Sequence, residues 1–218
     1  MTLVSETIEN AAVGVGIAET PQGLSAIHHP GCAAAIWRRQ PLDDFQTWIN
    51  DLPVEQLPRA RMILPISNVH QAVTHICNTY GTPHCDERER LVDDIAVLAS
   101  LFADLIPTSH IQLRLDVVTT SICPKFHIDA VTARLICTYR GTGTQYGIST
   151  DGADPRRVFT TPTGSPILLQ GTQWPDGPKS GLLHRSPSIE DTEETRLLLV
   201  IDPIDEQVQD RPNPEFIH

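Results

Sequence analysis

The sequence predicts a mainly β protein, α+β overall, in which a jelly roll (double-stranded β-helix) carries an N-terminal helical region packed on it. Helical spacing of apolar residues is confined to the part of the chain before Pro107. After Pro107, apolar and polar residues alternate, which is the pattern of half-buried strands. The strand-like segments are short, separated by turns rich in glycine, proline and aspartate, and never interrupted by a helical pattern. This order is typical of a jelly roll and not of repeated βαβ units.

The part before Pro107 contains the predicted helices and a few extended segments. Residues 1–30 have weak periodicity and predict an extended leader, and 33–39 predicts a short strand. Residues 61–66 are apolar and predict a strand or a buried connector. Gly81 is a suitable residue to end the second helix. Three helices are predicted, at residues 43–51, 67–81 and 87–105.

The part after Pro107 predicts a succession of strands. In HIQLRLDVV, residues 110–118, apolar residues alternate with Gln112, Arg114 and Asp116. Further strands are predicted at 125–129, 131–140, 144–148, 157–160, 166–170, 181–185 and 195–202. The expected organisation is one compact unit with a leader and covering helices (1–107), a β core with the site (108–203) and a polar tail (204–218).

The amino-acid composition limits the binding partners and the cellular compartment that we expect. The net charge is −11, from 27 acidic and 16 basic residues, so we expect neither nucleic acid nor an anionic membrane as a partner. The start of the chain lacks a positive segment followed by an apolar run, and no stretch approaches the ~18 apolar residues of a membrane span. The 5 cysteines have irregular spacings and no CxxC motif. Reduced thiols and a cytoplasmic location are the expectation.

A candidate metal centre begins with His127 and Asp129. Two residues apart on a strand, their side chains leave the same face and can share one ion. Neutral imidazole and carboxylate are common ligands of Fe(II), Mn(II) and Zn(II). His184 is the one histidine downstream within the β region, after 54 intervening residues, and is the candidate third ligand. With coordination bonds of ~2.0–2.2 Å, the three metal-facing groups should lie within ~5 Å of one another.

Several residues near this motif allow two interpretations. His127 and Asp129 could form an ordinary surface hydrogen bond, and Cys123 is either a small buried residue before a proline or a thiolate ligand that would favour Zn(II). Arg196 either binds an anionic group or pairs at a strand edge with Glu193, Glu194 or Asp202. Arg185, next to His184, is its rival for anion binding. Trp174 lies in a turn-rich loop as a hydrophobic plug or a lid over the site, and Tyr139 is expected in the core.

The HxD…H spacing followed after twelve residues by an arginine resembles the Fe(II)/2-oxoglutarate dioxygenase superfamily over roughly residues 123–202. The resemblance implies that His127, Asp129 and His184 hold iron. It also implies that Arg196 forms a bidentate pair with the far carboxylate of 2-oxoglutarate. HIDAVTARLICTY is further similar to the stretch after the HxD motif in prolyl-hydroxylase-like members. Arg134, Thr138 and Tyr139 occupy comparable places there, and the first two are candidate cofactor-binding residues.

A closer resemblance is to a bacterial family, the domain-of-unknown-function family 1826. Its pattern has C-x-x-F-H-x-D, then R-L…T-Y-x-G-x-G-T, and much later W-P…H-R-S-P. The matching residues here are Cys123, Phe126, His127, Asp129, Arg134, Leu135, Thr138, Tyr139, Gly141, Gly143, Thr144, Trp174, Pro175, His184, Arg185, Ser186 and Pro187. This resemblance names a family and not an activity.

Three functional hypotheses follow. The first is a non-haem Fe(II) oxygenase that uses 2-oxoglutarate and acts on a small-molecule or peptide substrate. The second is a cupin-like zinc protein for metal handling without oxidative chemistry, using Cys123 with the same histidines. The third is a jelly roll that serves only as an interaction module, in which the candidate ligands would not converge. The sequence contains no G-x-S-x-G, P-loop, dinucleotide fingerprint or HExxH motif.

Overall fold

The computed structural model describes residues 11–120, 125–175, 177–190 and 192–204. Helical segments are η1 (Pro21–His28), α1 (Asp43–Asp51), η2 (Val54–Gln56), η3 (Ile66–Asn68), α2 (Val69–Thr79) and α3 (Asp86–Leu105). The larger sheet is built from β1 (Gly14–Ala18), β2 (Cys32–Trp37), β3 (Ala60–Pro65), β4 (His110–Val118), β5 (Ala133–Arg140), β8 (Ile167–Gln170) and β10 (Arg196–Pro203). The smaller sheet is built from β6 (Gln145–Ile148), β7 (Phe159–Thr160) and β9 (Leu182–Arg185).

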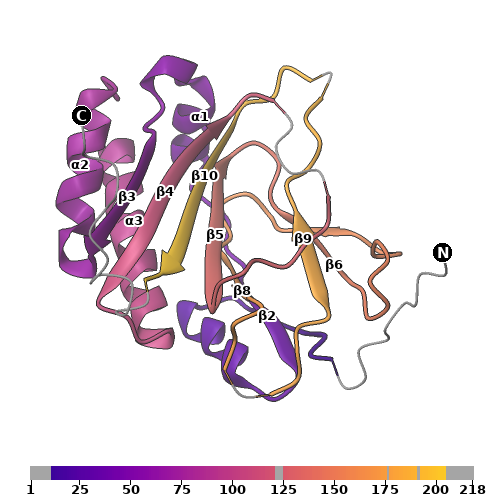
Figure 1. Cartoon of the computed structure of the whole chain (residues 1–218). Helices are drawn as coiled ribbons and strands as arrows, with labels where there is room; N and C mark the ends of the chain where they lie inside the picture. Colours follow the sequence, from indigo (N-terminus) through magenta and orange to yellow (C-terminus); the bar gives the residue numbers. More distant parts are fainter. Residues whose placement is uncertain (1–10, 121–124, 176, 191, 205–218) are drawn as a thin grey trace, which may run out of the picture.

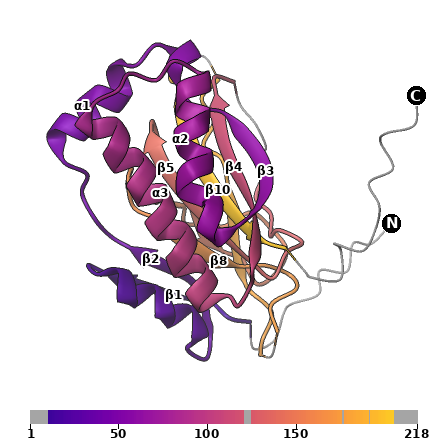
Figure 2. The same ribbon diagram turned by 90° about the vertical axis from the view of Figure 1, so that its left-hand side faces the viewer.

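The elements form three layers. The seven strands of the larger sheet have the order β1-β2-β8-β5-β10-β4-β3, and the three of the smaller have the order β7-β6-β9. Helices α1, α2 and α3 lie on one side of the larger sheet, and β6 and β9 lie on the other (Figure 1). Seen from the helical side, α2 and α3 lie in front of the sheet (Figure 2). The predicted jelly roll with a helical region packed on it is therefore confirmed.

The N-terminal part contributes strands as well as helices. Residues 14–18, within the expected leader, form a strand parallel to β2, and β3 pairs with β4 at the opposite edge. The predicted strand at 125–129 is wrong apart from a single bridge at His127. After that bridge the chain turns, and the carbonyl of Asp129 accepts a hydrogen bond from the amide of Thr172. No helix among the described residues is long and apolar enough to cross a membrane.

Successive side chains of each strand point to opposite faces of the larger sheet. On β10, Leu197, Leu199 and Ile201 belong to the core under the helices, which also contains the buried face of α3. Leu198 and Val200 point the other way and pack with residues of the smaller sheet. Burial of each such aliphatic side chain contributes about 1.5–3 kcal/mol. Arg196 and Asp202 share the parity of Leu198 and Val200, so they face the space between the two sheets.

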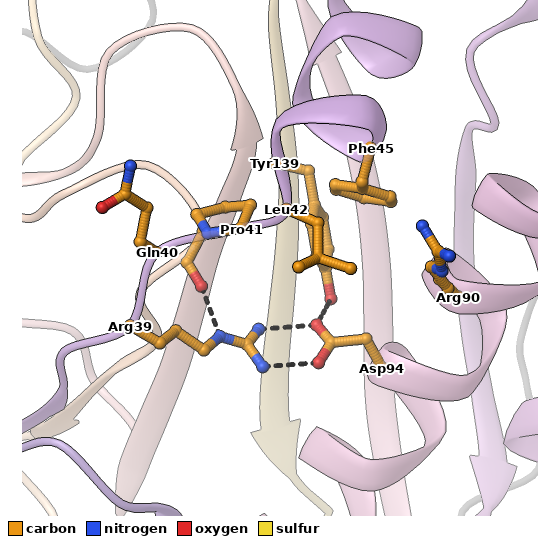
Figure 3. A pocket seen from close by; sticks show the side chains of 9 residues that line it. Arg39, Gln40, Pro41, Leu42, Phe45, Arg90, Asp94 and Tyr139 are labelled. Atoms are coloured by element: carbon orange, nitrogen blue, oxygen red, sulfur yellow. Dashed lines mark hydrogen bonds and ion pairs between the residues drawn. The ribbon is translucent and has the colours of Figure 1, made fainter.

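A buried polar cluster joins the helical layer to the sheet (Figure 3). Arg39 donates to both carboxylate oxygens of Asp94 on α3, at 2.5 and 2.6 Å, and to the carbonyl of Gly164 at 2.6 Å. The hydroxyl of Tyr139 on β5 donates to Asp94 Oδ2 at 2.7 Å. Burial, together with the charge of Asp94, raises the pKa of Tyr139 well above its ordinary value. Tyr139 is a core residue, as predicted, and its hydroxyl is a structural hydrogen-bond donor.

We expect Tyr139→Phe to lower the free energy of unfolding by about 1.5–3 kcal/mol, because it removes the hydrogen bond of a buried hydroxyl to a partly buried carboxylate. Urea unfolding followed by circular dichroism measures this loss. Tyr80→Phe is the matched control, since the half-buried Tyr80 hydroxyl makes no hydrogen bond to any residue that the structure describes. Equal unfolding midpoints for the two variants would contradict a structural role for the Tyr139 hydroxyl.

Candidate metal centre

A pair of backbone hydrogen bonds brings the two candidate histidines together. His184 lies on β9, and His127 lies in the segment that precedes β5. The amide of each donates to the carbonyl of the other at 3.0 Å, which forms an isolated antiparallel bridge. Directly opposite residues in such a bridge place their side chains on the same side. The two imidazole rings accordingly lie with their centroids 4.6 Å apart.

Asp129 completes the group two residues after His127. Its Oδ2 lies 3.0 Å from His184 Nε2, and its Oδ1 lies 3.6 Å from His127 Nε2. One donor atom from each of the three residues lies within 4.8 Å of the others. The predicted convergence of His127, Asp129 and His184 is therefore confirmed. The interaction-module hypothesis required that these groups stay apart, and the geometry contradicts it.

The donor atoms suit a divalent cation. His127 Nδ1 donates to the carbonyl of Lys125 at 2.9 Å, which leaves the lone pair of Nε2 directed at the group. Asp129 Oδ2 is buried, yet it accepts no hydrogen bond of good geometry from the described residues despite its distance to His184. A buried carboxylate oxygen without a hydrogen bond is costly, and coordination by a cation would satisfy it.

Local electrostatics place the residues in the protonation states that metal binding requires. Burial lowers the pKa of His184, which is 5% exposed, and this effect outweighs the close contact with the Asp129 carboxylate, so the imidazole is neutral at pH 7. Burial alone would raise the pKa of Asp129. The close contact with His184 Nε2 and the positive charge of Arg134 outweigh burial, so that the pKa is lowered and the group is a carboxylate.

Arg134 supports Asp129 from the larger sheet. Its Nη1 contacts Asp129 Oδ1, and its Nε and Nη2 donate to the two oxygens of Asp202 at 2.6 and 2.8 Å. The guanidinium is thus shared between two carboxylates. Sequence comparison implied cofactor binding by Arg134 and Thr138. In the structure Arg134 holds a candidate ligand in place, and Thr138 is buried outside the lining of the cavity.

The group opens into a cavity of about 140 Å³ between the two sheets. His127 and His184 line it together with three arginines, Arg114, Arg134 and Arg185. Arg185 donates to Gln145 Oε1 at 2.8 Å, and its guanidinium lies 4.3 Å from the centroid of the Phe126 ring. The remaining wall includes apolar residues of the larger sheet: Val118, Ile136, Leu198 and Val200. Arg114 was not among the site residues predicted from the sequence. The sequence pattern of β4 showed it only as one of the polar residues that alternate with apolar ones.

Arg196 is a buried cation that lies near the charge of Glu194 but forms no salt bridge with it or with any other described residue. Its side chain is 0% exposed, and its Nε donates to the carbonyl of Thr142 at 2.6 Å. Its Nη1 and Nη2 are buried and have no hydrogen-bond partner among the described residues. Burial lowers the pKa to about 10, so the group is still charged at pH 7.

In the described part of the chain no salt bridge joins Arg196 to Glu193, Glu194 or Asp202, although the charge of Glu194 partly offsets the effect of burial on the pKa of Arg196. Asp202 is bound by Arg134, and Glu194 contacts the amide and hydroxyl of Thr142. Arg196 instead faces the jelly roll interior at the end of β10. Its cross-strand partner Val118 and its neighbour on the same face, Leu198, both line the cavity.

Two other candidates lie elsewhere. Cys123 lies outside the described residues. Trp174 packs against the core under the helices, with its ring centroid 5.6 Å from that of His28, and it lines a separate cavity. The structure therefore favours the interpretation of Trp174 as a hydrophobic plug over that of a lid.

Comparison with protein families identifies the chain. The model of the family described as "Protein of unknown function (DUF1826)" matches residues 18–202. The protein belongs to the DUF1826 family. This confirms the resemblance seen in the C-x-x-F-H-x-D and W-P…H-R-S-P motifs. No curated protein matches the sequence.

Solved structures relate the fold of this DUF1826 member to oxygenases. Dioxygenase for auxin oxidation 1 from Arabidopsis thaliana, in a 2-oxoglutarate complex, matches with a TM-score of 0.52 and 13% identity, over 94% of this chain and 98% of that one. The rice dioxygenase for auxin oxidation matches with a TM-score of 0.49 and 12% identity, over 88% and 83%. Neurospora crassa T7H in complex with alpha-KG has a TM-score of 0.42 and 11% identity, over 93% and 88%. The first of these similarities shows a shared fold.

We expect the protein to bind one equivalent of a divalent cation such as Co²⁺ and to lose about 100-fold or more in affinity on Asp129→Ala, because a ligand is removed. Calorimetric titration of metal-free protein measures this. His75→Ala, on the exposed face of α2, is the control and should bind like the unmodified protein. Equal affinity in both variants would show that the three residues do not form a metal site.

Proposed function

We propose that this protein is a non-haem Fe(II) oxygenase that uses 2-oxoglutarate. The observation that carries the proposal is that the interior of the jelly roll contains two sets of polar side chains with unsatisfied bonding atoms. One is the His127–Asp129–His184 group with its unsatisfied carboxylate oxygen, and the other is the unpaired guanidinium of Arg196. A cation would complete the first and a dicarboxylate the second.

The three ligands would hold iron from one side. His127 is oriented by Lys125, and Asp129 is held by Arg134, so both are fixed before a metal arrives. Two imidazoles and one carboxylate on one face leave coordination positions open on the cavity side. Iron bound there would supply the activation of O₂, with one oxygen atom entering the substrate and the other entering succinate as 2-oxoglutarate loses CO₂.

Arg196 would bind the far carboxylate of 2-oxoglutarate. A guanidinium with two free Nη groups matches the two oxygens of a carboxylate, and burial strengthens the pair because water does not compete for it. Removing a charge from water is costly, and an incoming carboxylate offsets that cost. The buried cation is therefore best explained as one half of an ion pair whose other half is a ligand.

The walls of the cavity would exclude water from the reaction. Val118, Ile136, Leu198 and Val200 present only hydrocarbon to it. Exclusion of water by this apolar part of the wall would protect reactive species from side reactions with solvent. The same small volume indicates a small molecule, or a short side chain of a peptide, as the substrate.

Anaerobic purification followed by metal analysis tests the choice of metal. Iron, or tight binding of added Fe²⁺, supports the proposal. Stoichiometric zinc that added iron does not displace would support metal handling without oxidation. Formation of succinate from 2-oxoglutarate by the iron-loaded protein tests the chemistry directly, and its complete absence would contradict the proposal.

We expect Arg196→Met to weaken 2-oxoglutarate binding by about 100-fold, because a bidentate charged pair in a buried site is lost. Titration of 2-oxoglutarate into zinc-loaded protein measures binding without turnover. Arg61→Met, an exposed arginine on β3, is the control. Unchanged affinity in Arg196→Met would exclude Arg196 as the co-substrate ligand while leaving the metal site intact.

A further inference from the structure

Arg114 is an arginine of the cavity wall whose hydrogen-bond donors the fold does not use. It lies in the middle of β4, opposite Val200 of β10, and its side chain is 21% exposed. Like Val200 it faces the interior of the jelly roll, and it lines the same cavity as His127 and His184. Its position on a rigid central strand keeps the guanidinium beside the candidate metal centre.

Arg114 makes no hydrogen bond to any described residue. Its nearest carboxylate contacts are 3.7 Å to Asp116 and 3.9 Å to Asp202, both beyond hydrogen-bond distance. Asp202 is already engaged, because Arg134 donates to both of its oxygens. The Nε of Arg114 is buried and has no partner. A guanidinium in a cavity wall with all its donors unused is expected to have a ligand.

Neighbouring residues add to the free-energy cost of the positive charge on Arg114. Arg114 is directly opposite Arg61 on β3, and like charges at paired strand positions destabilise a sheet. Neither arginine forms a hydrogen bond within the described part of the chain. The whole protein carries a net charge of −11, so a cavity with three arginines in its wall is a local exception. A fold that needed only stability would not require an arginine here.

Arg114 and Arg196 lie at different levels along the paired strands β4 and β10. Arg114 on β4 pairs with Val200 of β10. Val200 and Arg196 are four residues apart on β10. At ~3.3 Å per residue this separation is about 13 Å along the strand. Arg196 lies at the far end of β10, whereas Arg114 contacts Asp202, which Arg134 connects to Asp129. Arg114 is thus the cation on the metal side that has only long carboxylate contacts and no hydrogen bond among the described residues.

We propose that Arg114 binds the carboxylate of the primary substrate, so that the substrate is a small organic acid. This inference rests on the proposed function, because it assigns 2-oxoglutarate to Arg196 and leaves Arg114 for the second ligand. The fork of the guanidinium matches a carboxylate bidentately. A singly charged carboxylate is favoured over a phosphate, because Asp116 and Asp202 lie within 4 Å of Arg114 and would repel a dianion more strongly.

Binding of simple acids to zinc-loaded protein saturated with 2-oxoglutarate tests this proposal. The probes are acetate, butyrate, hexanoate and benzoate, each with its neutral amide, and inorganic phosphate, followed by ligand-observed NMR. At least one carboxylate should bind, and its amide should bind about tenfold more weakly or not at all. Arg114→Met should weaken that carboxylate about tenfold or more, and Arg114→Lys should recover part of the loss, since it restores the charge and not the fork.

Arg61→Met is the matched control, because it removes an equal charge from the opposing position outside the cavity lining. It should change carboxylate affinity by less than about twofold. The melting temperature of Arg114→Met gives a second readout. A ligand-binding role predicts a nearly unchanged value, because no hydrogen bond is lost and relief of the repulsion with Arg61 offsets the loss of the two long contacts with Asp116 and Asp202, whereas a structural role predicts a lowered one.

Four outcomes would overturn the assignment: no carboxylate binds, an amide binds as well as its acid, phosphate is preferred, or Arg114→Met binds the acids like the unmodified protein. Loss of 2-oxoglutarate binding in Arg114→Met but not in Arg196→Met would also overturn it, by giving Arg114 to the co-substrate. Failure of the proposed function itself appears separately, as absence of 2-oxoglutarate binding to the unmodified protein.

Discussion

The two hydrogen bonds exchanged by the backbones of His127 and His184 are the contact on which the site depends. They attach the segment before β5 to the smaller sheet, and so join residues 57 positions apart in the chain. With the bridge in place, Asp129 reaches both imidazoles, and Arg134 reaches Asp129 from the larger sheet. The group therefore belongs to neither sheet alone. It forms only where the two sheets of the jelly roll approach each other.

Two groups of polar side chains on opposite sides of the larger sheet differ in how completely their hydrogen bonds are made. Around Arg39 and Asp94, on the helical side, each charged group faces a partner and the hydrogen bonds are short (Figure 3). Between the two sheets, Asp129 Oδ2, the Nε of Arg114 and both Nη groups of Arg196 lack partners among the described residues. Because a buried unpaired polar group costs free energy, its persistence beside a cavity points to a ligand that satisfies it.

Local patterns predicted most of the architecture. Helices α1, α2 and α3 begin and end within a few residues of the predicted segments, because their apolar spacing is set by the burial of one face. Strand β4 shows the predicted alternation for the same reason. The error at 125–129 arose where one bridge replaces a strand, since the turn after it is held by Thr172, a residue remote in sequence. Arg114 was overlooked because an arginine on an alternating strand usually faces water.

The sequence alone determined the family, the order of helices and strands, and the identity of His127, Asp129 and His184 as the residues able to share an ion, because these depend on residue type and spacing. Only the tertiary structure decided which arginines donate hydrogen bonds to carboxylates and which keep donors without a partner. Arg134 is consumed by Asp129 and Asp202, whereas Arg196 and Arg114 keep unused donors. Pairing of charges is set by the packing of strands distant in sequence, and no local pattern of residues encodes it.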